Sequence, residues 1–264
     1  NIMIKTIKTP VASIYEKPSF VAQMITQALM WESVEILEEA DNWYRIRQWD
    51  NYTGWVNSFY LTDQPFEDQD GIYIIDRFCP VHSDLGDDSF IVSGLSIGCR
   101  IPEASILEEN DNRYKVLLPD SASGWIPKQQ LSNLNLNDSI VNIANRLIGI
   151  PYLWGGKSSY GFDCSGFVQT VYLLTGIKLP RDSNYQERYS NFVDISIQNA
   201  SAGDLIFFSE NENISHVGIY LNDGKFIHCS GEVKINSFDS NDKLYCNSLH
   251  QKLHSVKSIQ KILN

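Results

Sequence analysis

The pattern of apolar and polar positions divides the chain near residue 136. Before that point, short clusters of β-forming residues, such as 34–37, 43–47 and 54–56, alternate with breaks of Asp, Asn and Gly. This arrangement is typical of short strands joined by tight turns. The first half is therefore predicted to consist of strands.

A sequence repeat runs through this first half. Residues 36–46 match residues 106–116, and residues 54–56 match residues 124–126. Both matches have the same offset of 70 positions, so they indicate two copies of one structural unit. Units of roughly 65 residues with strands this short suggest small β-barrels.

The second half has a different pattern. Apolar residues recur at helical spacing over residues 140–147, after a candidate N-cap at Asp138 or Ser139. A second amphipathic pattern begins at Cys164 and ends at Gly176. Strand-like segments follow at residues 204–209, 215–221, 225–229 and 255–259. Helices followed by antiparallel strands indicate an α+β domain.

Two polar stretches, residues 63–71 and 133–139, are interpreted as linkers. They predict three domains: a first barrel over residues 1–64, a second barrel over residues 65–135 and an α+β domain over residues 136–264.

The composition is that of a globular protein with a net charge of −11. No apolar run approaches the roughly 18 residues that a membrane-spanning helix requires. Residues 1–135 carry 10 basic and 20 acidic side chains, whereas residues 136–264 carry 11 and 12. The balance argues against nucleic acid as a partner, and an acidic first half could attract a cationic group on a substrate.

The five cysteines include no Cys-x-x-Cys pair, which disfavours a zinc site and a dense disulfide framework. Cys79 and Cys99 could pair in an oxidising compartment, and the sequence leaves this open. We expect no cofactor and no metal. Because the chain does not begin with Met, we expect a removed leader and an envelope location, periplasmic or secreted, rather than a cytoplasmic one.

Candidate chemistry centres on Cys164, which follows a Gly155-Gly156 loop and begins a predicted helix. The N-terminus of a helix favours an anion, so this position is predicted to lower the pKa of the thiol. His216 and His228, on strand-like segments, would supply a base and a group that orients it. The small Gly218 beside the base is expected to leave room for substrate.

Six short blocks in the second half agree in order and spacing with a known family. They are Tyr-x-Trp-Gly-Gly at 152–156, Asp-Cys-Ser-Gly-Phe at 163–167, Leu-Pro-Arg-Asp-Ser at 179–183, Gly-Asp-Leu-Ile-Phe-Phe at 203–208, His-Val-Gly-Ile-Tyr at 216–220 and Phe-Ile-His at 226–228. From about residue 138 to 264 the chain resembles NlpC-type cell-wall endopeptidases. The resemblance implies a papain-like cysteine peptidase domain, preceded by two small SH3-like β-barrels.

The front half resembles the bacterial SH3-like domains that accompany this catalytic domain. Residues 15–19 and 51–56 look like members whose first barrel helps to form the substrate site. That subgroup is similar to γ-D-glutamyl-L-diamino-acid endopeptidases. The resemblance implies hydrolysis of the amide between γ-D-Glu and diaminopimelate or Lys in peptidoglycan stem peptides, with a preference for a free N-terminal L-Ala.

The resemblance also assigns roles to individual residues. It implies Cys164 as nucleophile, His216 as base and His228 as the orienting residue. Asp163 would help to bind the free amine of L-Ala. Further substrate contacts are implied at Ser165, Ser183, Glu16 and Tyr52. Tyr152 is either a wall of the cleft or a donor to the oxyanion, and Ser183 could equally serve as a helix cap.

Three other readings remain open. The fold could carry an amidase or acyltransferase, the chain could be a catalytically weak peptidoglycan-binding module, or Cys164, His216 and His228 could hold a metal. No ligand-pair spacing supports the metal, and no catalytic residue is missing from the motifs. The role of the second barrel and the oligomeric state are also open, with a monomer expected.

Overall fold

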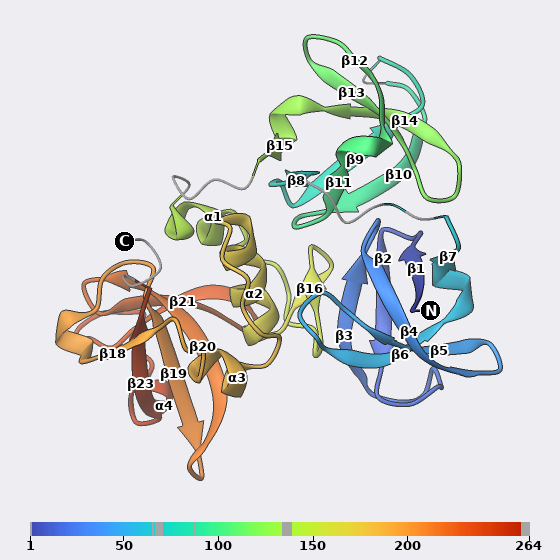
Figure 1. Ribbon diagram of the computed structural model, residues 1–264. Helices are drawn as coiled ribbons and strands as arrows, with labels where there is room; N and C mark the ends of the chain where they lie inside the picture. The colour runs from blue at the N-terminus through green and yellow to red at the C-terminus, as the bar shows by residue number, and fades with distance from the viewer. Residues whose placement is uncertain (1, 65, 67–70, 87, 134–138, 260–264) are drawn as a thin grey trace. The chain divides into compact units, whose positions relative to one another are not determined.

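The computed structural model describes residues 2–64, 66, 71–86, 88–133 and 139–259 (Figure 1). The chain separates into two compact units. The first contains residues 1–135 and 157–159, and the second contains residues 136–156 and 160–264. The predicted division of the first unit at residues 64 and 65 stays a prediction, and residues 65 and 67–70 lie outside the described part.

The first sheet of unit one is antiparallel and has the order β3-β2-β6-β5-β4-β1-β7. Its buried face holds an aliphatic core that includes Ile7, Ile14, Val34 and Ile46. A short 3-10 turn, Ser58–Tyr60, connects β6 and β7, which are the last two strands of this sheet in chain order. The strands are β1 Met3–Ile7, β2 Val11–Tyr15, β3 Met24–Leu29, β4 Ser33–Ala40, β5 Trp43–Arg47, β6 Thr53–Asn57 and β7 Leu61–Thr62.

The following residues repeat this topology in two sheets, ordered β10-β9-β14-β13-β12 and β11-β8-β15. Two 3-10 turns, Glu103–Ser105 and Lys128–Gln130, lie between these strands. The strands are β8 Gly71–Ile74, β9 Phe78–His82, β10 Ile91–Ser96, β11 Arg100–Pro102, β12 Ile106–Glu109, β13 Arg113–Leu117, β14 Ser123–Pro127 and β15 Leu131–Ser132.

The strand register confirms the sequence repeat. Ile36 pairs with Ile46 in the first copy, and Ile106 pairs with Val116 in the second, again with an offset of 70. Both β4 and β12 have a register shift directly after these pairs.

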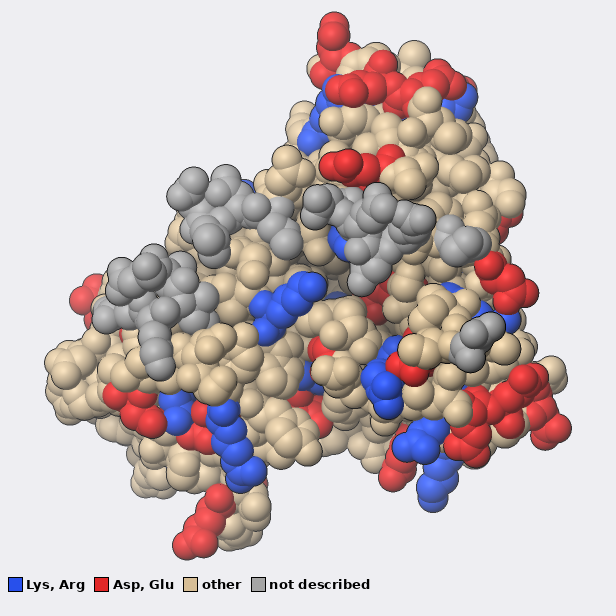
Figure 2. Space-filling model, in the orientation of Figure 1, with Lys and Arg blue, Asp and Glu red and all other residues tan. Residues whose placement is uncertain are grey.

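On the face shown in Figure 2, acidic side chains gather at the end of unit one that carries β12 and β13.

Buried residues also join the two copies. Trp31 is 1% exposed and donates its indole N–H to the carbonyl of Leu117, and it belongs to the core of the second copy. Cys79 and Cys99 are buried in that same core as free thiols. The disulfide that the sequence left open is therefore not formed in this structure.

Unit two has a six-stranded antiparallel sheet, ordered β18-β23-β19-β20-β21-β22, with helices packed against it (Figure 1). The helix α2 contacts β20 and β21, and α3 contacts β20. The helices are α1 Ile140–Arg146, α2 Cys164–Leu174, α3 Ser183–Glu187 and α4 Asn247–His250. The strands are β18 Val193–Ile195, β19 Leu205–Glu210, β20 Asn213–Asn222, β21 Lys225–Ser230, β22 Glu232–Ser237 and β23 Leu253–Ser258, with a 3-10 turn at Ile197–Asn199 before β19.

A small hairpin precedes α2, formed by β16 Lys157–Ser158 and β17 Gly161–Phe162. Its first strand and the residue that follows, 157–159, belong to unit one. Both helices predicted from the apolar spacing are confirmed, and Ser139 occupies the N-cap position of α1 without a side-chain hydrogen bond. The alternative cap, Asp138, lies outside the described residues. The strands β18 and β22 were not predicted.

Candidate active site

Cys164 is the first residue of α2, and the residues around it build the start of that helix. Asp163 is the N-cap, and its Oδ1 accepts a hydrogen bond from the backbone N–H of Gly166 at 2.7 Å. A Cβ atom at Gly166 would lie 2.1 Å from the carbonyl oxygen of Gly156. The glycine therefore lets the Gly155-Gly156 loop pack directly against the first turn of the helix.

The helix that begins at Cys164 packs against strand β20. The backbone N–H groups of Ser165 and of Val217, which follows His216, favour the charged form of the thiol. Burial, followed by the charge of Asp163, raises the pKa of the Cys164 thiol to about 12. The predicted lowering of this pKa is therefore wrong. The backbone N–H groups do lower it, but the loss of hydration outweighs them.

The two histidines are brought together by the register of β20 and β21. Gly218 lies directly opposite His228, so His216, two residues earlier, is a diagonal neighbour on the same face. The Nε2 atom of His216 is 2.7 Å from Nδ1 of His228, and the rings are nearly perpendicular.

The role expected of Gly218 needs correction. A Cβ atom there would lie 3.1 Å from Cβ of His228 and 3.1 Å from the carbonyl oxygen of Ile227. The absence of a side chain therefore makes room for His228 and the neighbouring strand, rather than for a substrate.

A third polar side chain, Asn236 on β22, continues the contact. Its Oδ1 is 2.9 Å from Nε2 of His228, and its Nδ2 donates to the carbonyl of Leu244 at 2.9 Å. Asn236 was not among the predicted site residues because β22 was not predicted. The alternation of Val233 and Ile235 with polar residues was the signal that could have identified the strand.

Burial controls the charge of both histidines. It lowers the pKa of His216 to about 3, and the charges of His228 and Lys234 add to the effect. Burial also lowers the pKa of His228 to about 4, although the hydrogen bond to Asn236 opposes this shift. The rings of Phe208 and Phe226 pack against the pair and supply apolar surroundings. The resting site therefore holds a neutral thiol and neutral imidazoles.

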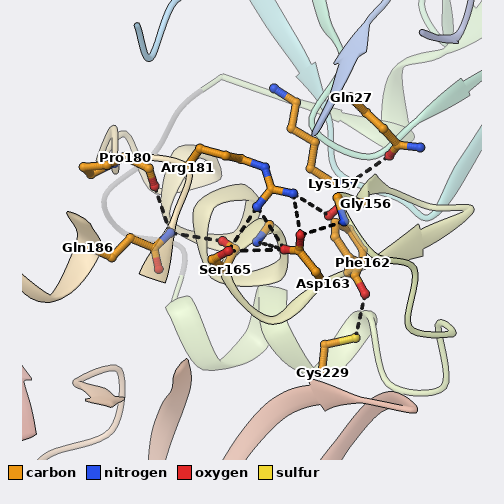
Figure 3. A network of polar contacts seen from close by, with 12 residues as sticks. Gln27, Gly156, Lys157, Phe162, Asp163, Ser165, Pro180, Arg181, Gln186 and Cys229 are labelled. Atoms are coloured by element: carbon orange, nitrogen blue, oxygen red, sulfur yellow. Dashed lines mark hydrogen bonds and ion pairs between the residues drawn. The ribbon is translucent and has the colours of Figure 1, made fainter. Parts of the chain in front are cut away.

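Asp163 forms a buried ion pair with Arg181, whose side chain is 1% exposed (Figure 3). Arg181 donates to Oδ1 at 2.9 Å and to Oδ2 at 2.6 Å, and Gly155 N–H donates to Oδ2 at 3.0 Å. The N–H of Gly166 and, at 3.3 Å, the hydroxyl of Ser165 complete the set on Oδ1.

These five donors occupy both oxygens of Asp163, and a carboxylate offers about four acceptor positions. The substrate-amine contact expected of Asp163 stays a prediction. In the structure the carboxylate fixes the start of α2 and the glycine loop. Ser165 belongs to the same buried network, since Arg181 donates to its hydroxyl at 3.0 Å and Gln186 donates to its carbonyl at 3.1 Å.

The other candidate contacts lie on separate elements. Ser183 is the half-buried first residue of α3, and the N-cap position belongs to Asp182. Glu16 is exposed and follows β2, and Tyr52 is half-buried before β6, both in unit one. The substrate roles of these three residues stay predictions.

Tyr152 lies within electrostatic range of the nucleophile candidate. Burial raises the pKa of its phenol to about 12, and the Cys164 thiol and the Asp163 carboxylate add to this shift. The phenol is therefore neutral and keeps its O–H as a donor.

Within the described ranges, no group of three or more His, Cys, Asp or Glu side chains is arranged to hold a metal ion. In the same part of the chain, no helix has both the length and the apolar character to span a bilayer.

Two family descriptions match the chain. The NlpC/P60 family matches residues 149–254, a range that contains Cys164, His216 and His228. The bacterial SH3 domain matches residues 10–62, the first copy of the repeat.

Individual proteins are similar over longer stretches. A γ-D-glutamyl-L-lysine dipeptidyl-peptidase from Bacillus cereus is 30% identical over 225 residues, which are 77% of this chain and 66% of that protein. Dipeptidyl-peptidase 6 from Lysinibacillus sphaericus is 28% identical over 94% of this chain and 96% of its own length. The crystal structure of an NlpC/P60 family protein from Bacillus cereus has the same fold. Its TM-score is 0.85, with 22% identity over 97% of this chain and 99% of that one.

Proposed function

The chain belongs to the NlpC/P60 family and is a cysteine peptidase, and from this premise we propose that it cleaves peptidoglycan stem peptides. The bond cleaved is the amide between γ-D-Glu and the diamino acid, either Lys or diaminopimelate. One observation carries the proposal: Cys164 begins α2, which packs against the strand that holds His216, and His216 is hydrogen-bonded to His228. The names of the relatives support the choice of bond.

The reaction begins from neutral groups. His216 has its Nε2 engaged with His228, so Nδ1 takes the proton of Cys164 while the sulfur attacks the γ-carbonyl of D-Glu. Because burial raises the pKa of the thiol and lowers that of the imidazole, the proton moves as the carbon–sulfur bond forms. The imidazolium then gives its proton to the leaving amine, and a thioester remains on Cys164. Water, deprotonated by His216, releases the acyl product and restores the thiol.

Two donors are available to the oxyanion that forms at the γ-carbonyl. The backbone N–H of Cys164 lies at the start of α2, and the Tyr152 phenol is kept protonated by its raised pKa. Removal of one such donor typically costs about 3–4 kcal/mol of transition-state stabilisation. Tyr152→Phe removes the hydroxyl without changing the ring, so it should lower kcat.

The substrate is a peptide with a free N-terminal L-Ala. A dipeptidyl-peptidase, as two of the relatives are named, releases two residues from an unblocked end. Glu16 and Asp163 are the carboxylates that we assign to the ammonium group, and Tyr52, in the same unit as Glu16, is a further proposed contact. A charged hydrogen-bonding group left unpaired in a binding site costs about 1–3 kcal/mol or more. An acylated amine would impose that cost.

The second copy of the repeat is also assigned to the SH3-like class. This assignment rests on the likeness of the second copy to the first, because its strand order, register and bulge positions repeat those of residues 10–62. It lacks the Tyr-x-Gly-Trp sequence of residues 52–55, so we assign it no substrate contact. The envelope location stays a prediction.

The test is mass spectrometry of the products from L-Ala-γ-D-Glu-L-Lys and L-Ala-γ-D-Glu-diaminopimelate. We expect L-Ala-γ-D-Glu and the free diamino acid, with little cleavage when the Ala amine is acetylated. Release of any other fragment would refute the proposed bond. Equal cleavage of the acetylated peptide or of whole sacculi would refute the amine requirement while leaving the bond intact.

A further inference from the structure

A chain of polar contacts runs across three adjacent strands behind the nucleophile. It begins at the backbone carbonyl of Leu244, continues through Asn236 on β22 and His228 on β21, and ends at His216 on β20. The successive separations are 2.9, 2.9 and 2.7 Å. Each is a short, direct contact, so every link holds one proton.

The direction of those protons is determined at the Leu244 end. A backbone carbonyl can only accept, so the amide nitrogen of Asn236 donates to it and the amide oxygen faces His228. That oxygen can only accept, so His228 carries its proton on Nε2. The Nδ1 atom of His228 is then a lone pair, and it accepts from Nε2–H of His216.

The consequence is that Nδ1 of His216 has a lone pair, as a base requires. This inference rests on the proposed function. We propose that Asn236 is a positioning residue, which, anchored by the Leu244 carbonyl, selects the tautomer in which His216 can accept the thiol proton. His228 alone does not select the tautomer of His216, because a neutral imidazole has two tautomers of its own.

The opposite tautomers of the two histidines are disfavoured because they would direct two lone pairs at each other. If His228 carried its proton on Nδ1, its Nε2 lone pair would face the Asn236 oxygen. Rotating the amide would relieve that contact, but would direct its oxygen at the Leu244 carbonyl. His228 is 1% exposed, so water does not compensate for either arrangement.

Two substitutions at one position separate this role from a structural one. Asn236→Leu and Asn236→Asp remove the amide N–H that binds Leu244, but the aspartate keeps an oxygen that accepts from His228. In Asn236→Leu the Nε2–H of His228 would be buried without a partner, which favours the opposite tautomer. We expect kcat to fall by about 5- to 150-fold with KM within about twofold. Asn236→Asp should lose less kcat than Asn236→Leu, because it keeps the acceptor for His228 although its second oxygen faces the Leu244 carbonyl.

The control is Asn241→Leu, an equivalent change at an exposed residue in the loop after β22, which should leave kcat unchanged. The direct readout is the ¹⁵N chemical shifts of the imidazole nitrogens in the full chain. Wild type and Asn236→Asp should show His216 and His228 protonated on Nε2, whereas Asn236→Leu should show Nδ1 protonation.

Three results would overturn the proposal. One is Nδ1 protonation of His228 in wild type, another is equal loss of kcat in both Asn236 variants, and the third is wild-type kcat in Asn236→Leu. The nitrogen shifts need no substrate, so they remain informative if the proposed peptide is not cleaved. Failure of cleavage with the expected shifts would count against the proposed function alone.

Discussion

Replacing Arg181 with methionine should destabilise the peptidase domain by about 3–5 kcal/mol, because it leaves a buried carboxylate without its cation. Arg181 is 1% exposed and contacts both oxygens of Asp163, at 2.9 and 2.6 Å. It also donates to the hydroxyl of Ser165 at 3.0 Å. Methionine fills a similar length but has no N–H donor, so all of these contacts are lost together.

A second substitution tests whether the unpaired charge is the cause. Asp163→Asn removes the charge but retains a good N-cap for α2. The double variant Asp163→Asn/Arg181→Met should therefore be more stable than Arg181→Met alone, by at least about 1 kcal/mol. A matched control is Lys252→Met, whose partner is Glu210. The side chains of that pair are 42% and 59% exposed, so its loss should leave the free energy of unfolding nearly unchanged.

The assay is urea unfolding followed by hydrogen exchange at the amides of α2, which reports on unit two separately from unit one. Two outcomes would refute the reasoning. Arg181→Met could cost no more than Lys252→Met, in which case the buried pair contributes as little as a surface pair. The free energy of unfolding lost in the double variant could also equal the sum of the losses in the two single variants. In that case the unpaired carboxylate is not the source of the loss.

Three further predictions concern the same domain. Cys164→Ala should abolish peptide cleavage while far-UV circular dichroism stays unchanged, and substantial turnover would refute the nucleophile assignment. Gly166→Ala should also remove activity, because its Cβ would lie 2.1 Å from the Gly156 carbonyl; wild-type kcat would show that the loop adapts freely. Since the pKa values of His216 and His228 are lowered to about 3 and 4, only the unfolded chain gains these protons as pH falls from 6.5 towards 4. The free energy of unfolding, measured in urea, should then fall by about 1.4 kcal/mol per pH unit for each histidine, and the slope should be shallower in His228→Gln.

Much of the fold could be predicted because it follows local rules. The repeat offset of 70 residues, read from two matching blocks, returns in the register of β4–β5 and β12–β13. The helix at Cys164 follows from apolar spacing and from an Asp at its N-cap. The edge strand β18 was missed because three largely exposed residues have no clear periodicity, whereas β22 carried an alternating signal at Val233 and Ile235 that was overlooked.

The site was predicted in its residue types but not in its energetics. The motifs identify Cys164, His216 and His228, and the comparisons place the chain in the family that the motifs resemble. A sequence does not show how much water surrounds a thiol. The predicted low pKa of Cys164 was wrong because burial outweighs the N–H groups at the helix start.

The amino-acid sequence alone therefore determined which chemistry is present, a cysteine after an N-cap and two histidines on strands, and that a unit of β-strands is repeated. Only the tertiary structure decided the partners, because side chains far apart in the chain meet through strand register and helix packing. That packing occupies Asp163 with Arg181, from 18 residues away, and places Asn236 behind His228. Hydrogen bonding and desolvation depend on these neighbours in space, and no local pattern specifies them.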